Sequence, residues 1–280
     1  MPTTDKEPVH VVIMAGGLGK RMKSELPKVL HPVGGLPMLS RVIKTALRLE
    51  HTEYSYVVSS VHVIAGKYKS VIEETLQRTL TQDEYARIAY AIQEEALGTG
   101  HAVRCALPYL MDRPEKDRVL VLSGDVPLMT TETLHNMLSA YDSVPECQFT
   151  LLLNSPEDPT GCGRVLMDPI TKTFERIVEE KDATDEQKKI RLANCGIYVF
   201  NLGALRKELP RVNNDNAQKE YYLPDVLPFI QQTYKERDGN TAPVTIHHLD
   251  SENDYQVMNI NNREQLSKAE EIFQEKEHTD

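Results

Sequence analysis

The chain has 280 residues, enough for one large α/β domain or two small ones with a sizeable buried core. Its formal net charge of -10 at pH 7 argues against a general nucleic-acid-binding protein, because that binding needs many cations to neutralise phosphates. No stretch approaches the roughly 18 apolar residues of a membrane helix, and the N-terminus does not resemble a secretory signal, so we expect a cytosolic protein without membrane contacts.

Strand and helix patterns alternate along the first half of the chain. An apolar, β-branched run predicts a buried strand over 9–14 that leads into a glycine-rich turn. The elements expected after it are a helix over 38–49, a strand over 54–59, a helix over 71–80, a strand over 88–92, a helix over 101–110 and a buried strand over 118–123. This alternation indicates βαβ units, and therefore an α/β fold with a mostly parallel sheet.

Short strands dominate the pattern after about residue 143. We expect strands over 148–153, 164–167, 173–178, 193–200 and 244–249, and helices over 201–209, 223–234 and 262–276. No linker separates the part with alternating strands and helices from the part with short strands. The pattern therefore predicts a single domain over 1–280, with one half over about 9–145 and a more β-rich half over about 146–280.

A glycine-rich loop over Ala15–Met22 follows the first predicted strand. Glycines let backbone N–H groups approach phosphate oxygens closely, and Arg21 and Lys28 add positive charge. The loop is not a Walker A loop, because Arg21 follows Lys20 where that motif needs Ser or Thr. Nor is it G-x-G-x-x-G, because Met22 stands in place of the third glycine. The residues fit either a phosphate-binding loop or a plain turn with solvated cations.

Asp125 comes just after the predicted strand over 118–123. Ligands of open α/β folds bind at the carboxyl edge of the sheet, and a carboxylate there can hold Mg²⁺ that bridges nucleotide phosphates. An aspartate in a turn before Pro127 is an equally good reading. Gln93 ends another predicted strand and could bind a base edge, whereas Thr99 could cap the following helix while its loop touches a ligand.

Taken in order, these motifs resemble the uridylyltransferase domain of the bacterial N-acetylglucosamine-1-phosphate uridylyltransferases. The segments that carry the resemblance are the glycine loop with LPKVLH, then LGTGHA, GDVPL, DPTGCGRV, IVEEKDATDEQ, NAQKEYYLPD and NNREQL, and they span 9 to about 271. The resemblance implies a Rossmann-like mixed sheet with a β-rich sugar-binding lobe. It also implies Mg²⁺-dependent transfer of a uridylyl group from UTP to N-acetylglucosamine 1-phosphate.

The resemblance assigns roles residue by residue. Arg21 and Lys28 are the implied catalytic residues, and Asp125 and Asn261 are the implied metal ligands. Substrate contacts are implied at Met14, Ala15, Gly17, Gln93, Gly98, Thr99, Gly124, Gly163, Glu179 and Asn194. Of these, Gln93, Gly98 and Thr99 would contact the uracil, and Gly163, Glu179 and Asn194 the sugar.

The sequence departs from the family pattern near the sugar contacts and in length. Cys162 replaces a common tyrosine, and Asn259 a common glycine. Cys162 and Cys195 each neighbour an implied sugar contact, and are either inert buried residues or thiols whose alkylation blocks sugar binding. Bacterial members usually continue into an acetyltransferase β-helix. This sequence ends at Asp280 without hexapeptide repeats, so we expect no acetyl transfer.

Two alternatives to this function stay open. The same reaction could use glucose 1-phosphate or N-acetylgalactosamine 1-phosphate. Alternatively, the chain could be a silent UDP-sugar-binding regulator, although the presence of Arg21, Lys28, Asp125 and Asn261 argues against a silent relative. The sequence carries no signal for an oligomeric state.

Overall fold

A computed structural model describes residues 8–17, 19–51 and 53–277. By proximity of Cα atoms the chain divides into two compact units. The first consists of Met1–Ala96, Leu120–His135 and Tyr255–Asp280, and the second of Leu97–Val119 and Asn136–Asp254. Neither unit is one continuous segment, so residues far apart in sequence come together within each.

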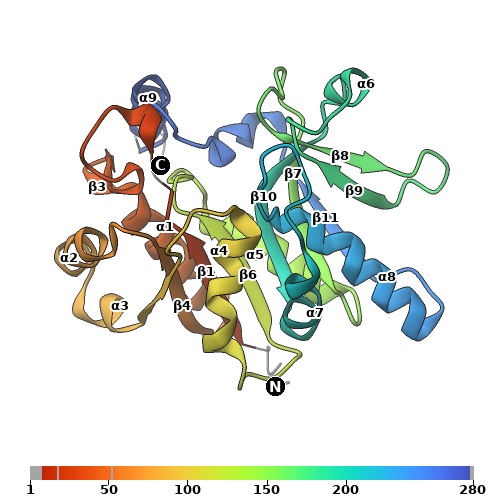
Figure 1. Ribbon diagram of the computed structural model, residues 1–280. Coiled ribbons are helices and arrows are strands. Elements are labelled where there is room, and N and C mark those ends of the chain that lie inside the picture. Colours follow the sequence, from red (N-terminus) through yellow and green to blue (C-terminus); the bar gives the residue numbers. More distant parts are fainter. Residues whose placement is uncertain (1–7, 18, 52, 278–280) are drawn as a thin grey trace. The chain divides into compact units, whose positions relative to one another are not determined.

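The first unit contains parallel strands covered by helices. Its strands are β1 (Val9–Met14), β4 (Val58–Ala65), β5 (Ile88–Ile92) and the end of β6 (Arg118–Ser123). They follow the order β6-β1-β4-β5, and β4 pairs in parallel with both β1 and β5. Its helices are α1 (Met38–Leu47), α2 (Lys69–Thr79), α3 (Gln82–Ala86), the start of α5 (Thr131–Ser143) and α9 (Arg263–Glu277), shown in Figure 1.

The core of this unit follows from the residue pattern. The first five residues of β1 are buried, as expected for a parallel strand that is covered on both faces. Helix α1 places Leu39 and Ile43 on its buried side, and neither side chain is exposed. Burying an aliphatic side chain of this size contributes about 1.5–3 kcal/mol. The helix is therefore held by its apolar face and not by its few intrahelical bonds alone.

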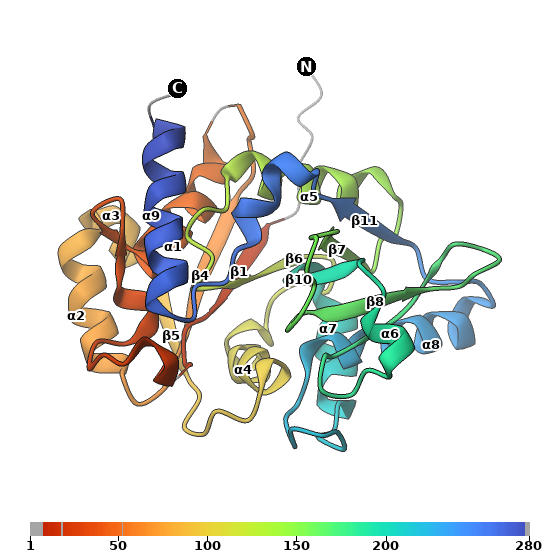
Figure 2. The same cartoon turned by 90° about the horizontal axis from the view of Figure 1, so that it is seen from above.

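The second unit is richer in antiparallel pairs. Its strands are β7 (Phe149–Asn154), β8 (Gly163–Met167), β9 (Phe174–Val178), β10 (Ala193–Asn201) and β11 (Val244–His248). Strand β7 pairs in parallel with β11 and antiparallel with β10, and β8 pairs antiparallel with β10 and β9. The helices are α4 (Thr99–Ala106), α6 (Asp185–Lys188), α7 (Leu202–Glu208) and α8 (Val226–Asp238), and α7 and α8 lie side by side (Figure 2).

The expected α/β class with a mixed, mostly parallel sheet is confirmed. The predicted strands over 88–92 and 118–123 match β5 and β6 in both bounds. The strand predicted over 54–59 is wrong, since Ser55 has a φ of 56° in a turn and β4 begins only at Val58. Among the described residues, no helix is long and apolar enough to cross a membrane.

Strand β4 escaped prediction because its buried face carries polar side chains. His10 Nδ1 and His62 Nε2 each lie 2.8 Å from Ser60 Oγ, so a hydrogen-bonded cluster replaces part of the apolar pattern. Helices α3, α5 and α6 were not expected either. Thr81 and Thr184 each accept a hydrogen bond from the backbone three residues on, in capping boxes that start α3 and α6.

A two-residue hairpin turn in the first unit provides a test of the fold. Gly34 and Gly35 join β2 (Pro32–Val33) to β3 (Leu36–Pro37) with φ angles of 54° and 74°, which a type I′ turn requires. A Cβ at Gly34 would collide with the Phe273 ring and the Arg41 guanidinium, whereas a Cβ at Gly35 would meet nothing within 4 Å.

We expect Gly34→Ala to melt at a lower temperature than Gly35→Ala. Both variants place alanine at a positive φ, so they share the backbone strain, and only Gly34→Ala adds a clash worth about 1–3 kcal/mol. Thermal unfolding followed by circular dichroism measures the difference. Equal melting temperatures for the two variants would show that the packing of α9 against this hairpin is wrong.

Candidate functional site

The carboxyl ends of β1 and β6 meet closely in the first unit. The Gly124 N–H donates to the Met14 carbonyl at 2.9 Å, and the Ala15 N–H donates to the Ile64 carbonyl at 2.9 Å. A Cβ at Gly124 would lie 3.1 Å from the Met14 oxygen and 3.2 Å from a methyl group of Val29. Glycine at position 124 therefore allows the two strand ends to approach without displacing these neighbours, which brings Met14, Ala15 and Gly124 to the edge where ligands of open α/β sheets bind.

Three predicted site residues converge just beyond this edge. Lys28 Nζ lies 2.5 Å from Asp125 Oδ2 and 2.9 Å from Asn261 Oδ1. The Ser123 hydroxyl donates to the other oxygen of Asp125 at 2.5 Å. Lys28, Asp125 and Asn261 come from distant parts of the sequence, and the fold gathers them into one polar cluster. Ser123 was not singled out in the sequence, although it stands two residues before Asp125 in a motif that was.

The side chain of Asn261 is oriented by its own neighbours. Its backbone N–H donates to Gln265 Oε1 at 2.8 Å, and its Nδ2 lies 3.3 Å from the Asn259 carbonyl as donor. Because the amide nitrogen is engaged there, the amide oxygen faces the Lys28 ammonium. Asp125 is 6% exposed, so its carboxylate depends on these partners for compensation of its charge.

The cluster fits a hard divalent cation. One carboxylate oxygen and one amide oxygen already converge on a positive charge, the Lys28 ammonium, and such oxygens are the ligands that these cations prefer. In the described part of the chain no group of three or more His, Cys, Asp or Glu side chains could hold a metal. Asp125 and Asn261 would therefore share a cation with substrate phosphates, as is usual for Mg²⁺ sites.

The glycine-rich loop lies against Lys28 and against Gln93, the residue that follows β5. Gly19 has a φ of 57°, and a Cβ there would lie 2.7 Å from Lys28 Cβ. A Cβ at Gly16 would lie 3.0 Å from Gln93 Oε1, whereas one at Gly17 would meet nothing within 4 Å. The loop thus brings Gln93 beside Gly16 and leaves Gly17 open. Leu18 lies outside the described residues.

Arg21, the other predicted catalytic residue, does not join the polar cluster. It lies in a short 3-10 helix, Lys20–Met22, and its side chain is exposed. No hydrogen bond or ion pair links it to Lys28, Asp125 or Asn261, all of which the structure describes. Its role at the site stays a prediction.

Gly98 and Thr99 hold a neighbouring segment in the second unit. Gly98 has a φ of 106°, and a Cβ there would lie 2.6 Å from the Tyr221 carbonyl. The Thr99 hydroxyl accepts the Leu223 N–H at 3.0 Å. The interpretation of Thr99 as the N-cap of α4 is wrong, because Gly98 occupies that position and makes no side-chain cap. The threonine hydroxyl is used in tertiary structure instead.

The three implied sugar contacts come together: Gly163 on β8, Asn194 on β10, and Glu179 directly after β9. Asn194 pairs with Gly163 across the antiparallel strands, and a Cβ at Gly163 would lie 3.0 Å from Glu179 Oε1. Asn194 Nδ2 donates to the Tyr198 hydroxyl at 2.7 Å, and its Oδ1 accepts the Gly196 N–H at 3.1 Å. Gly163, Glu179 and Asn194 therefore share one face, with Tyr198 as a buried neighbour that the sequence analysis had missed.

Glu179 lies in an acidic cluster. Burial, followed by the charges of Asp225 and Asp182, raises its pKa to about 7. Burial and then Asp182 raise the pKa of Asp225 to about 6. The Tyr222 hydroxyl donates to Asp182 at 3.2 Å. A carboxyl that is half protonated near pH 7 can both donate and accept hydrogen bonds, which suits recognition of a neutral, hydroxyl-rich ligand.

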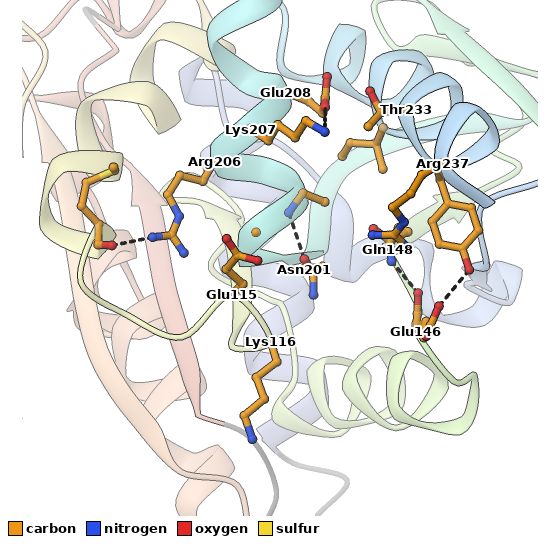
Figure 3. Close-up of a pocket in the computed structure, with 15 residues that line it drawn as sticks. Glu115, Lys116, Glu146, Gln148, Asn201, Arg206, Lys207, Glu208, Thr233 and Arg237 are labelled. Atoms are coloured by element: carbon orange, nitrogen blue, oxygen red, sulfur yellow. Dashed lines mark hydrogen bonds and ion pairs between the residues drawn. The ribbon is translucent and has the colours of Figure 1, made fainter.

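A separate cavity of about 870 Å³ opens in the second unit beside α7 and α8 (Figure 3). Glu208 lines it and is buried, with Oε2 accepting from Arg211 at 2.5 Å. The Tyr234 hydroxyl donates to Glu146 across another wall at 3.0 Å. The predicted site residues do not line this cavity, so size alone does not identify the functional site.

The raised pKa of Glu179 predicts a pH-dependent stability. The ordinary value is 4.5 and the folded value about 7, so the folded state binds this proton more tightly than the unfolded state. The stabilisation is complete below pH 4.5 and is lost as the pH rises through about 7. We expect the melting temperature of Glu179→Gln to fall less than that of the wild type as the pH rises from 4.5 to about 7.

Glu175→Gln is the matched control, because Glu175 is exposed on β9, the strand that ends one residue before Glu179. It should follow the wild type at each pH. If Glu179→Gln also showed the wild-type pH dependence of melting temperature, the carboxyl would not be titrating from a raised pKa.

Comparisons with known proteins agree with this geometry. Residues 11–166 match the family described as the MobA-like NTP transferase domain. The chain is 37% identical to a probable UDP-N-acetylglucosamine pyrophosphorylase of Acanthamoeba polyphaga mimivirus, over 94% of this chain and 96% of that protein. It is 38% identical to the bifunctional protein GlmU of Trichodesmium erythraeum, over 95% of this chain and 52% of that protein.

A third relative is the bifunctional protein GlmU of Stenotrophomonas maltophilia, 42% identical over 81% of this chain and 45% of that protein. The chain thus spans about half the length of the bifunctional relatives that it matches, and nearly all of the viral one. The family match covers more than half of the chain and includes the glycine loop, Asp125 and Gly163. The chain therefore belongs to the family of the MobA-like NTP transferase domain and is a nucleotidyltransferase.

Proposed function

We propose that the protein transfers a uridylyl group from UTP to N-acetylglucosamine 1-phosphate, giving UDP-N-acetylglucosamine and pyrophosphate. The observation that carries the proposal is the convergence of Lys28, Asp125 and Asn261 in a chain similar along nearly its whole length to a probable UDP-N-acetylglucosamine pyrophosphorylase. The similarity to the bifunctional GlmU proteins is in keeping with this proposal, and it concerns only the half of those proteins that the chain matches.

The reaction is an in-line displacement at phosphorus. An oxygen of the sugar phosphate forms a bond to the α-phosphorus of UTP, and the bond to the departing pyrophosphate breaks. The sugar phosphate is already ionised near pH 7, so no general base is needed. Reactions of this kind depend on positioning and on neutralisation of charge. We assign that neutralisation to Lys28, Arg21 and the backbone N–H groups around Gly17.

We propose Mg²⁺ as the divalent cation. When bound it would neutralise charge on the nucleotide and sugar phosphates. Asp125 and Asn261 would hold it, since their oxygens already face a cation in the Lys28 ammonium. Lys28 would then turn to a phosphate oxygen, because one ammonium and one divalent cation cannot both occupy the space between the same two ligands. Gln93, Gly98 and Thr99 would contact the uracil.

We assign the sugar to Gly163, Glu179 and Asn194. Gly163 leaves open the space beside the Glu179 carboxyl that a side chain would fill. Asn194 offers amide groups for an N-acetyl substituent or a hydroxyl. We further propose that the reaction takes place in the cytosol, where stable structural disulfides are rare; the four cysteines of the chain are free in the structure.

We expect a clear preference for N-acetylglucosamine 1-phosphate over glucose 1-phosphate in a pyrophosphate-release assay with UTP. Polar groups placed for an N-acetyl substituent go unpaired when the substituent is missing, which costs binding free energy. N-acetylgalactosamine 1-phosphate belongs in the same panel, because it keeps the substituent. Equal kcat/KM for all three would contradict the sugar assignment, and no turnover with any of them would favour a silent UDP-sugar-binding regulator.

Asp125→Asn tests the metal site. The change keeps shape but removes the charge that Lys28 and a divalent cation would share. Metal charge stabilisation is typically worth several kcal/mol, and each ~1.4 kcal/mol is about tenfold in rate, so kcat/KM should fall roughly 100-fold or more. Mn²⁺ binding in the presence of UTP, followed by electron paramagnetic resonance, should weaken in parallel.

The control is Asp185→Asn, an exposed position in α6, which should leave both measurements unchanged. A folded Asp125→Asn protein with wild-type kcat/KM would remove Asp125 from the reaction. Weakened Mn²⁺ binding with unchanged turnover would show that the cation is held there without being needed.

A further inference from the structure

Two cysteines that are far apart in sequence lie next to the pairing of β8 with β10: Cys162 directly precedes β8, and Cys195 lies within β10. The antiparallel register pairs Arg164 with Ala193 and Gly163 with Asn194, so each paired sum of residue numbers is 357. The printed pairing ends at Gly163, the first residue of β8; continued by one position into the bend at Cys162, the same register would bring Cys162 opposite Cys195. Both are free cysteines, separated by 33 residues in sequence.

The hydrogen bonds show which kind of pair this is. The Val165 N–H donates to the Leu192 carbonyl at 2.9 Å, so that pair is hydrogen-bonded, and bonded and non-bonded pairs alternate along an antiparallel ladder. By this alternation, a pair of Cys162 and Cys195 at the next position would be non-hydrogen-bonded. The Cys162 N–H is used in a turn, where it donates to the Pro159 carbonyl at 3.0 Å. Non-bonded pairs hold their Cα atoms about 4.5 Å apart, within the range that a disulfide spans.

The surroundings of the two thiols are consistent with this placement. Burial raises the pKa of Cys195 well above its ordinary value, and the nearby Cys162 raises it further, as expected for two acidic groups in proximity. Burial also raises the pKa of Cys162. The Cys195 thiol lies 3.6 Å from Asn154 Oδ1, to which it donates. The site does not favour a thiolate, and so lacks the stabilised reduced form of strongly oxidising dithiols.

We propose that Cys162 and Cys195 form a reversible intramolecular disulfide by exchange with a low-molecular-weight disulfide. One thiol, as its thiolate, attacks a sulfur of the small disulfide and releases the first small thiol. The second protein thiol then attacks the mixed disulfide and releases the other. One S–S bond forms in the protein, one is broken in the reagent, and the two protons of the protein thiols end on the two small thiols.

The bond would lie directly beside two implied sugar contacts, and this consequence rests on the proposed function. Gly163 follows Cys162 and Asn194 precedes Cys195, with their side-chain positions on the opposite face of the strand pair. A disulfide would therefore act through the backbone of β8 and β10. Gly196, with a φ of 72°, and the register shift between Asn194 and Tyr198 give the backbone room to adjust next to Cys195. We expect KM for the sugar phosphate to rise several-fold while KM for UTP stays constant.

The bond itself is tested on the whole protein without substrate. The protein is equilibrated with mixtures of oxidised and reduced dithiothreitol, quenched with acid, alkylated and digested. Mass spectrometry should show a peptide pair linked through Cys162 and Cys195, with a midpoint that follows the dithiothreitol ratio. Cys162→Ser should abolish the link, whereas Cys105→Ser, the matched control in α4, should leave it intact.

The outcomes separate this inference from the proposed function. Absence of the linked pair in a protein that circular dichroism shows to be folded would overturn the disulfide, whatever reaction the protein catalyses. A linked pair that involves Cys105 or Cys147 instead would overturn it too. If the linked protein had unchanged KM for the sugar phosphate, the coupling to the sugar contacts would be wrong. Restoration of KM by reduced dithiothreitol, absent in Cys162→Ser, supports it.

Discussion

The buried carboxylate of Asp125, just after the end of β6, constrains how the first unit can fold. Asp125 is 6% exposed, and a charge at such a position is stable only when cations and hydrogen-bond donors compensate for it. Lys28 and Ser123 supply this compensation from one side, and Asn261 shares the lysine from the other. The loop after β1 and the segment before α9 must therefore both reach the end of β6. The chemistry at this edge depends on their doing so.

Close backbone approach makes that arrangement possible. The Gly124 N–H reaches the Met14 carbonyl, and the lack of a side chain at Gly124 leaves space for Val29 beside it. Lys28 is held near Gly19 by the same requirement, since a Cβ at Gly19 would overlap the lysine stem. Gly19 and Gly124 thus allow charged groups to approach each other, in addition to allowing the chain to turn. They let a lysine and a carboxylate meet where a phosphate-bearing ligand would bring further negative charge.

The second unit has a different electrostatic environment at its predicted site residues. Its predicted sugar contacts lie among carboxyl groups, and burial keeps the pKa of Glu179 near 7, so the cluster holds protons instead of counter-cations. Such a site suits a neutral polyol better than a phosphate. In the proposed reaction, the residues of the first unit would meet negative phosphate oxygens, and those of the second would meet hydroxyl and amide groups. This difference in substrate chemistry matches the difference in charge between the two sets of residues. The proposed disulfide would add a covalent control next to the predicted sugar contacts.

The sequence by itself determined the α/β class, most strands and helices, and the motif residues, because apolar runs of period 2 or 3.6 and glycines after strands are local signals. It placed a strand over 54–59 and missed β4 from Ser60 onward, where a His–Ser–His cluster replaces apolar side chains. It also missed the cap of α4, where a tertiary contact uses the Thr99 hydroxyl. Only the tertiary structure decided which residues meet. Lys28 with Asn261 and Glu179 with Asp225 are pairings between distant segments, and so is the inferred pair of Cys162 with Cys195. Packing of the loops fixes the first two and strand register the third, and neither property is written in any short stretch of sequence.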